Sequence, residues 1–280
     1  MEGTRYNFIT SNLHYMDLQL RDKVIIVSGG AKGIGEGITR VLAAEGAIPV
    51  IIGRNEADNH KLADEIASAG GQAYAITAEL NQPEACEPAV RSVLAKFGRI
   101  DGIVNNAGQN DGVGLENGGY EAFMLSLHRN LIHYYLLVHH ALPALIASKG
   151  SVVNITSKTA ETGQGNTSAY AAANGGRNAL TREWAVELLK YGIRVNAIVV
   201  AECYTPLYEK WLGTLSEPEE KRREIESKIP LGNRMTTKEE IADMTAFLLS
   251  ERSSHTTGQL IHVDGGYVHL DRSLETLKRK

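Results

Sequence analysis

The chain has 280 residues, of which 43% are hydrophobic and 22% charged, a composition typical of a globular protein with a sizeable core. Its formal net charge of −4 is too small, and of the wrong sign, to predict a nucleic-acid partner. No uninterrupted apolar run reaches about 18 residues, so we expect no membrane span. Cys86 and Cys203 lie far apart without CxxC spacing, which predicts neither a disulfide framework nor a metal site. A reducing cytoplasm is the expected location.

Seven short runs rich in β-branched residues predict strands. Each run is continuously hydrophobic rather than alternating, which is typical of a strand buried on both faces. The runs lie at residues 24–27, 49–52, 73–76, 102–105, 151–155, 195–199 and 260–263. Amphipathic stretches between them predict helices at residues 34–45, 56–69, 84–97, 121–148, 168–191 and 238–249. This alternation predicts an α/β fold, with a single doubly wound parallel sheet of about seven strands and helices on both faces.

Two segments fall outside this alternation. Residues 1–15 are polar and lack the regions of a secretory signal, so we expect an extension before one domain at residues 16–280. Residues 202–234 form a long, charged excursion with three aromatic residues near its start, Tyr204, Tyr208 and Trp211. Long excursions of this kind are more often functional than idle, which favours a lid over a ligand site. A surface helical hairpin is the alternative.

Residues 28–35, Ser-Gly-Gly-Ala-Lys-Gly-Ile-Gly, follow the first predicted strand and open the first predicted helix. Glycines there permit a tight turn and let the backbone approach a pyrophosphate, while the helix N-terminus offers N–H groups and a partial positive charge. A glycine cluster alone is a weak signal. Its position between a strand and a helix nevertheless predicts a dinucleotide-binding site.

The G-x-x-x-G-x-G spacing of this segment resembles that of the short-chain dehydrogenase/reductase family, and further segments extend the resemblance over about residues 17–271. They are Asn105-Asn106-Ala107-Gly108, Asn130, Ser157 thirteen residues before Tyr170, Arg194-Val195-Asn196-Ala197 and Val263-Asp264-Gly265-Gly266. The resemblance implies a Rossmann-type fold, oxidoreductase activity and a nicotinamide cofactor.

By the same resemblance, the cofactor contacts the glycine segment, several strand ends and the segment after the sixth strand. The implied residues are Gly29, Lys32, Gly33, Ile34, Gly35, Arg54, Glu79, Leu80, Asn106, Ala107, Gly108, Tyr170 and Thr205. NAD-preferring enzymes place a carboxylate at the end of the second strand, where this chain has Gly53 followed by Arg54. Arg54 and Lys32 favour the 2′-phosphate of NADP over the diol of NAD, unless both cations are simply solvated.

The resemblance also implies catalytic roles. Tyr170 would remove the proton of the substrate hydroxyl, Ser157 would hold the substrate oxygen, and Asn130 would anchor a proton-carrying water chain. An unperturbed tyrosine has a pKa of about 10, and in the family a lysine one helical turn later supplies a charge that favours the phenolate. This chain has Asn174 there, whose amide can donate to the cofactor ribose but is neutral. We therefore expect turnover to be lowered by ~10²–10⁴, with Lys158 as an alternative source of charge.

Several segments are similar to the bacterial L-fucose dehydrogenases, namely residues 110–112, 129–135, 157–160, 162–168, 181–185 and 254–258. This resemblance implies oxidation of the C1 hydroxyl of L-fucose to a lactone, with related pyranoses such as D-arabinose or L-galactose left open. The implied substrate contacts are Asn110, Ser157, Lys158, Gln164, Tyr170 and Glu202. Such polar groups suit a polyhydroxy ring, because unpaired hydroxyls are costly to bury. Each of them is also compatible with a plain surface position.

Two functions from different classes remain open at this stage. The first is an NADP-preferring sugar dehydrogenase with impaired chemistry, which we expect to be a homotetramer that uses the helices at residues 121–148 and 168–191 as faces. The second is a catalytically silent cofactor- or sugar-binding protein of the same fold. The sequence is also compatible with an Asn174 introduced deliberately into an active enzyme.

Overall fold

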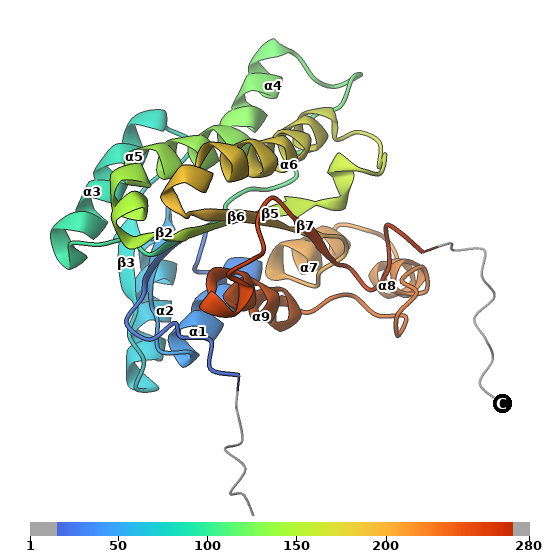
Figure 1. The fold of residues 1–280 in the computed structure, drawn as a ribbon. Coiled ribbons are helices and arrows are strands. Elements are labelled where there is room, and N and C mark those ends of the chain that lie inside the picture. Colours follow the sequence, from blue (N-terminus) through green and yellow to red (C-terminus); the bar gives the residue numbers. More distant parts are fainter. Residues whose placement is uncertain (1–15, 271–280) are drawn as a thin grey trace, which may run out of the picture.

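A computed structural model describes residues 16–270, so the extension expected at residues 1–15 lies outside the described residues. Seven strands form one parallel sheet in the order β3-β2-β1-β4-β5-β6-β7 (Figure 1). The strands are β1 Val24–Ser28, β2 Ile48–Gly53, β3 Tyr74–Thr77, β4 Gly102–Asn105, β5 Ser151–Ser157, β6 Arg194–Val200 and β7 Leu260–Val263. Each coincides with a predicted run, so the predicted parallel sheet is confirmed.

All six predicted helical stretches are present, with small shifts at their ends, and two further helices lie within residues 202–234. They are α1 Gly33–Ala44, α2 Glu56–Ser68, η1 Pro83–Ala85, α3 Cys86–Phe97, α4 Tyr120–Leu127, η2 His128–Ile132, α5 His133–Ser148, η3 Lys158–Ala160, α6 Ser168–Glu187, η4 Leu189–Tyr191, α7 Pro206–Leu212, α8 Pro218–Glu226, α9 Lys238–Leu249 and η5 Glu251–Ser253. The turn η2 has π-helical hydrogen bonds and lies between α4 and α5 without a break.

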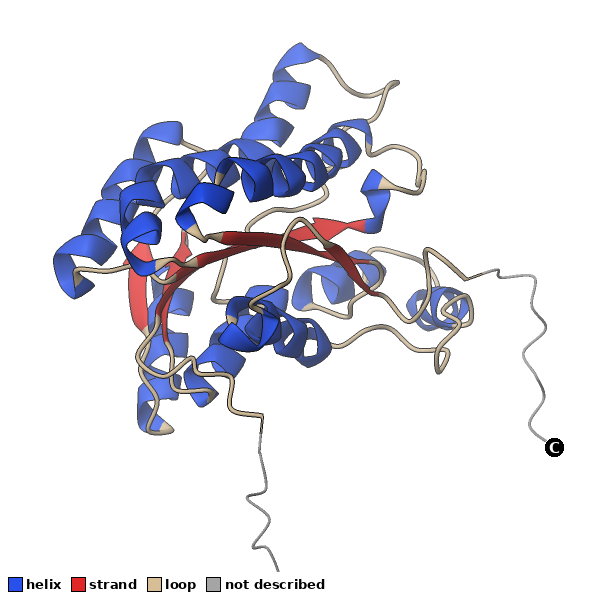
Figure 2. Cartoon of the chain, viewed as in Figure 1, coloured by secondary structure: helices blue, strands red, loops and turns tan. Residues whose placement is uncertain are grey.

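Helices cover both faces of the sheet (Figure 2), and hydrophobic clusters fill the space between helices and sheet. Along β1, Ile26 belongs to the layer shared with α3, α5 and α6, whereas Ile25 and Val27 belong to the layer shared with α1 and α9. Helix α2 covers the outer part of the second face through a smaller cluster that includes Ile51. Successive side chains of a strand point to opposite faces. Burial on both faces therefore explains why the strands are hydrophobic at every position.

The parallel pairing places all strand carboxyl ends along one edge of the sheet. The strand order reverses direction between β1 and β4, which are hydrogen-bonded neighbours although two other strands separate them in sequence. Ligands of open α/β sheets bind at this kind of switch point, because the loops that follow the two strands diverge there. The segments after Ser28, Asn105 and Ser157 consequently meet at this edge.

The segment Tyr120–Ser148 is a continuous helix of 29 residues, and an 18-residue window within it has a mean hydropathy of 1.3, which would allow it to cross a membrane by length and composition alone. Polar residues interrupt its apolar stretches, so no single uninterrupted apolar run marks it. In the structure it lies across the sheet beside α3 and α6 (Figure 1). Tyr134, Leu137 and Leu145 are fully buried in the core, and 33% of the apolar window is buried.

His133 should make the fold sensitive to acid. Its side chain is 1% exposed, Nε2 lies 3.0 Å from the Arg129 carbonyl oxygen, and burial lowers the pKa of His133 from 6.5 to about 3. Between these values the unfolded chain binds a proton that the folded chain does not, so stability falls as pH decreases through this range. We expect a loss of about 2 kcal/mol between pH 6.5 and pH 5. Urea unfolding at both pH values measures it, and His133→Gln should show a shallower pH dependence than the parent protein.

Candidate active site

The glycine turn after β1 has a backbone that other residues could not adopt without strain. Gly29 and Gly33 have φ angles of +63° and +55°, in the left-handed region. A Cβ at Gly35 would lie 2.1 Å from the Gly29 carbonyl oxygen, so the turn and the first turn of α1 are packed backbone to backbone. The N-cap residue Lys32 makes no side-chain cap. The first-turn N–H groups of α1 are thus suited to an anion such as a diphosphate.

The loop after β4 is joined to this turn by hydrogen bonds. The Asn106 side-chain amide donates to the carbonyl oxygens of Ser28 at 3.0 Å and Gly29 at 3.2 Å. In return, Ser28 Oγ accepts from the backbone N–H groups of Asn106 and Ala107 at 2.8 and 3.0 Å. The structure therefore brings together two groups of predicted cofactor residues from separate parts of the chain.

The two cations expected near the ribose both have carboxylate neighbours. Lys32 Nζ lies 2.6 Å from Asp58 Oδ2, and Arg54 Nη1 lies 3.8 Å from Glu79 Oε2. Both basic side chains are about two-thirds exposed, at 65% for Lys32 and 67% for Arg54. Exposed ion pairs of this kind contribute little energy. A phosphate would thus compete mainly with Asp58, which the sequence did not identify as a neighbour.

The start of the 202–234 segment lies against the glycine turn. A Cβ at Gly33 would be 3.4 Å from the Thr205 side chain, so these two predicted cofactor residues are adjacent. Thr205 also caps α7, because its hydroxyl accepts from the Tyr208 backbone N–H at 3.3 Å. The cap sets the direction in which the segment leaves the edge of the sheet.

The residues expected to perform the chemistry come from three adjoining elements. Ser157 ends β5, Tyr170 lies in the first turn of α6, and Asn130 lies in the π-helical turn η2. Helix α6 packs against β5, η2 and η3. Asn130 is fully buried, and its side-chain oxygen accepts from the Gln109 backbone N–H at 2.8 Å. Single π-helical turns are frequent at functional sites, and this one fixes Asn130 between the β4 loop and α6.

Asn174 is completely buried, and both ends of its amide are engaged. Its nitrogen donates to the Tyr170 backbone oxygen at 2.8 Å, and its oxygen accepts from Arg177 Nη1 at 3.0 Å. Arg177 also donates to the backbone oxygens of Asn130 and Ile155. Asn174 was expected at this site from its spacing to Tyr170, whereas Arg177 was not. The only sequence signal for Arg177 is its position seven residues after Tyr170, on the same helix face.

Two predicted substrate residues, Lys158 and Glu202, are paired with each other. The Lys158 ammonium forms an ion pair with the Glu202 carboxylate and lies 4.1 Å from the centroid of the Tyr267 ring. The Tyr208 hydroxyl donates to the same carboxylate at 2.9 Å, and burial followed by the Glu202 charge raises the pKa of Tyr208 well above its usual value. Because the Lys158 ammonium is paired with Glu202, we do not expect it to supply the positive charge that a lysine at position 174 would give.

The other two predicted substrate residues are exposed. The Asn110 side-chain oxygen accepts from the Gly112 backbone N–H at 3.1 Å, which closes a local turn. Gln164 is exposed within the loop that precedes α6. Each is therefore accessible, although among the described residues no hydrogen bond or ion pair joins either of them to Lys158 or Glu202.

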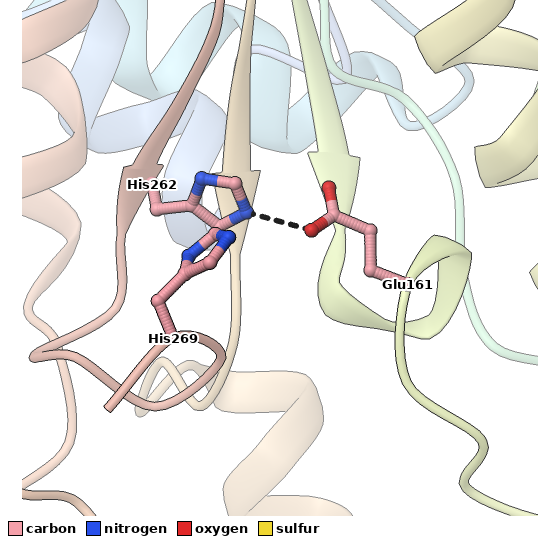
Figure 3. Close-up of side chains that lie close together, drawn as sticks. All are labelled: Glu161, His262 and His269. Carbon is pink, nitrogen blue, oxygen red and sulfur yellow. Dashed lines mark hydrogen bonds and ion pairs between the residues drawn. The ribbon is translucent and has the colours of Figure 1, made fainter. Parts of the chain in front are cut away.

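A group of possible metal ligands, which the sequence did not reveal, lies beyond η3. Glu161 follows η3, His262 lies on β7 and His269 lies in the turn after β7 (Figure 3). His262 Nε2 is 3.0 Å from Glu161 Oε2, and the two imidazole rings are nearly perpendicular with centroids 4.3 Å apart. The sequence did not indicate this group, because Glu161 lies 101 positions before His262.

Comparison with known proteins identifies the family. The family profile described as enoyl-(acyl carrier protein) reductase matches residues 29–268. The L-fucose dehydrogenase of Mus musculus is 34% identical over 245 residues, which are 87% of this chain and 88% of that protein. The fold, the glycine turn and these matches show that the chain belongs to the short-chain dehydrogenase/reductase family. It is thus an oxidoreductase scaffold of a family that uses NAD(P).

Solved structures support the same assignment. The crystal structure of the Cj0485 dehydrogenase is 46% identical with a TM-score of 0.88, and the match covers 93% of this chain and 99% of that chain. The ligand-free aldohexose dehydrogenase of Thermoplasma acidophilum is 28% identical with a TM-score of 0.81, over 90% of this chain and 96% of that chain. Sugar dehydrogenases are therefore among the relatives in both sequence and structure.

Proposed function

We propose that this protein is an NAD(P)-dependent sugar dehydrogenase that oxidises the C1 hydroxyl of L-fucose, or of a related pyranose, to the lactone. The observation that supports this proposal is that the elements carrying Ser157, Tyr170 and Asn130 adjoin one another, near the edge of the sheet that carries the glycine turn. The similarity to L-fucose and aldohexose dehydrogenases supports a sugar as the substrate.

The residues present fit a dinucleotide, because the glycine turn leaves the α1 N–H groups open to a diphosphate. When bound, the nicotinamide supplies a hydride acceptor for the C1 hydrogen. Ser157 holds the C1 oxygen, and the Tyr170 phenolate takes the hydroxyl proton as the carbonyl of the lactone forms. Asn130 helps to pass that proton towards solvent. Asn174 itself supplies no charge directly to the phenolate, so we expect slower turnover than in a family member with a lysine at this position.

We also propose NADP as the preferred cofactor, bound at its 2′-phosphate by Arg54 and Lys32. Arg54→Gln should weaken NADP⁺ binding by about tenfold, since one charge-assisted contact is lost, and should leave NAD⁺ binding nearly unchanged. Fluorescence titration with the two cofactors measures both affinities. If Arg54→Gln weakens the binding of NADP⁺ and of NAD⁺ equally, Arg54 does not bind the 2′-phosphate.

Residues 202–234 and the two long helices have further proposed roles, in covering the ligand and in forming oligomer interfaces. We propose that the segment acts as a lid over bound ligands, which the position of Thr205 beside Gly33 supports. A surface helical hairpin is the alternative. We propose a cytoplasmic homotetramer that uses the long helices, α4–α5 and α6, as faces. Sedimentation equilibrium would test the assembly.

The function is tested by mixing the protein with L-fucose and NADP⁺ or NAD⁺ and following nicotinamide absorbance, with D-arabinose and L-galactose as competitors. We expect slow turnover that yields the lactone. A catalytically silent binding protein is the alternative, which the buried and neutral Asn174 favours. Tight cofactor binding without turnover of any of the three sugars would establish that alternative.

A further inference from the structure

Arg177 is a buried cation without an acidic partner. Its side chain is 3% exposed, and none of the described carboxylates forms an ion pair with it. Its hydrogen-bond acceptors are all neutral oxygens, which belong to Asn130, Ile155 and Asn174. Burial of an unpaired charge costs free energy of folding, so we expect the buried charge of Arg177 to have a functional role.

The guanidinium lies where the catalytic elements meet. Tyr170, Asn174 and Arg177 occupy positions i, i+4 and i+7 of α6, which share one helix face. A Cβ at Gly108 would lie 2.7 Å from both Arg177 Nη2 and Asn130 Oδ1, so the guanidinium also abuts the loop after β4. Asn174 links Arg177 to Tyr170, because its side-chain oxygen accepts from the guanidinium and its side-chain nitrogen donates to the Tyr170 backbone oxygen.

We infer that the Arg177 guanidinium supplies the positive charge that a lysine at position 174 supplies in the family, and that Asn174 orients it. This inference rests on the proposed function, and it makes Arg177 a positioning residue that acts on Tyr170 through the protein interior. An arginine is always charged in proteins, so it favours the phenolate without moving a proton itself. Asn174 and Arg177 then act together, because the amide oxygen of Asn174 accepts a hydrogen bond from Arg177, whereas the ammonium of a lysine would repel it.

The other titratable groups near the guanidinium leave its charge uncancelled. His133 and Tyr134 face it from α5, with the Arg177 guanidinium 4.3 Å from the Tyr134 ring centroid. His133 stays neutral because burial lowers its pKa to about 3. Burial raises the pKa of Tyr134, and the Arg177 charge opposes that rise, so the guanidinium acts electrostatically on a neighbouring phenol.

Charge and hydrogen bonding are separated by comparing Arg177→Lys with Arg177→Gln. Both variants lose the guanidinium hydrogen bonds, but only the first retains a charge. We expect Arg177→Gln to move the midpoint of the pH–rate profile upward by about one unit and to lower turnover near neutral pH about tenfold. Arg177→Lys should keep most of the parental midpoint. Equal midpoints in the parent protein and both variants would overturn the inference.

A second measurement places a lysine at position 174 in two backgrounds. With Arg177 present, Asn174→Lys brings two cations together, so we expect little gain in turnover. In the Arg177→Gln background the same lysine stands alone, and we expect at least about a tenfold gain. The same change in both backgrounds would show that Arg177 has only a structural role.

A spectroscopic readout separates this inference from the proposed function. The tyrosinate absorbance of each protein, minus that of its Tyr170→Phe counterpart, reports ionisation of Tyr170 without any substrate. If no sugar is oxidised but Arg177→Gln still shifts this titration upward, the proposed function fails and the role of Arg177 stands. If sugars are oxidised but Arg177→Gln does not shift this titration, the proposed function stands and the role of Arg177 fails. Thermal unfolding confirms that each variant is folded.

The cluster of Glu161, His262 and His269 carries an independent inference. One ligand atom from each residue lies within 4.8 Å of the others, and they come from three separate segments that converge (Figure 3). The three side chains also border an open cavity of about 720 Å³ between α6 and β7, which gives water access to them.

The geometry points to a zinc site formed by Glu161, His262 and His269, with water as the fourth ligand. Two imidazole nitrogens and one carboxylate oxygen form a set that Zn²⁺ accepts in tetrahedral sites with an open position. Binding would replace the present His262–Glu161 hydrogen bond with two bonds to the metal.

The test is equilibrium dialysis of the untagged protein against zinc sulfate, followed by atomic absorption. We expect about one tightly held Zn²⁺ per chain and its loss in His262→Ala and in His269→Ala. His140→Ala is the matched control, because His139 and His140 also have adjacent rings, 5.1 Å apart, but do not belong to the cluster. Absence of bound zinc, or equal zinc in His262→Ala and His140→Ala, would overturn the proposal.

Discussion

Replacing Tyr170 with phenylalanine should lower sugar oxidation by about 10²- to 10⁴-fold and leave cofactor binding nearly unchanged. The ring and its packing at the start of α6 are kept, and only the hydroxyl that receives the substrate proton is lost. Steady-state turnover together with cofactor titration separates the chemical step from binding. A loss of this size without weaker binding would identify Tyr170 as the proton acceptor.

The matched control is Tyr135→Phe, because Tyr135 is 49% exposed on α5 and stacks on His139, away from the proposed chemistry. It should behave like the parent protein. Retention of more than about a tenth of parental turnover in Tyr170→Phe would mean that another group accepts the proton.

Substituting Gly35 with alanine should weaken binding of both NADP⁺ and NAD⁺ by about 10- to 100-fold, because the backbone of the phosphate turn must shift. The added Cβ would lie 2.1 Å from the Gly29 carbonyl oxygen and 2.7 Å from Asn106 Nδ2. Neither neighbour can retreat easily, since Asn106 also bonds to Ser28. Isothermal titration with each cofactor measures the effect.

Gly175→Ala provides the control for this substitution. Gly175 also lies in a helix, and a Cβ there would meet nothing within 4 Å outside the local helix backbone. Its cofactor affinity should match that of the parent protein. Unchanged affinity in Gly35→Ala would show that the cofactor does not depend on the close packing of this turn.

Local physics made much of the fold predictable. The strands are buried on both faces, so each is a continuous hydrophobic run, and the alternation with helical patterns implied the parallel order. The glycine turn is equally local, because left-handed angles and a 2.1 Å approach leave no room for side chains. Helix ends were less predictable: α3 begins only after the turn η1, and the long helix contains the π-helical turn η2.

Side-chain pairs between residues far apart in the sequence could not be predicted. Arg177 lies 47 positions from Asn130, and Lys158 lies 44 positions from Glu202, so no local pattern links them. Lys32 was expected to meet a phosphate, but the structure places Asp58 beside it. Which charge is buried, and which partner neutralises it, depends on how whole elements pack.

Backbone freedom and hydrophobic periodicity are local properties, so the sheet, the glycine turn and the spacing of Ser157, Tyr170 and residue 174 could be read from the sequence. The burial of Asn174 against Arg177 and the pairing of Lys158 with Glu202 became visible only in the folded chain. Desolvation and distance control the effect of a charge, and both arise only when separate segments have folded together.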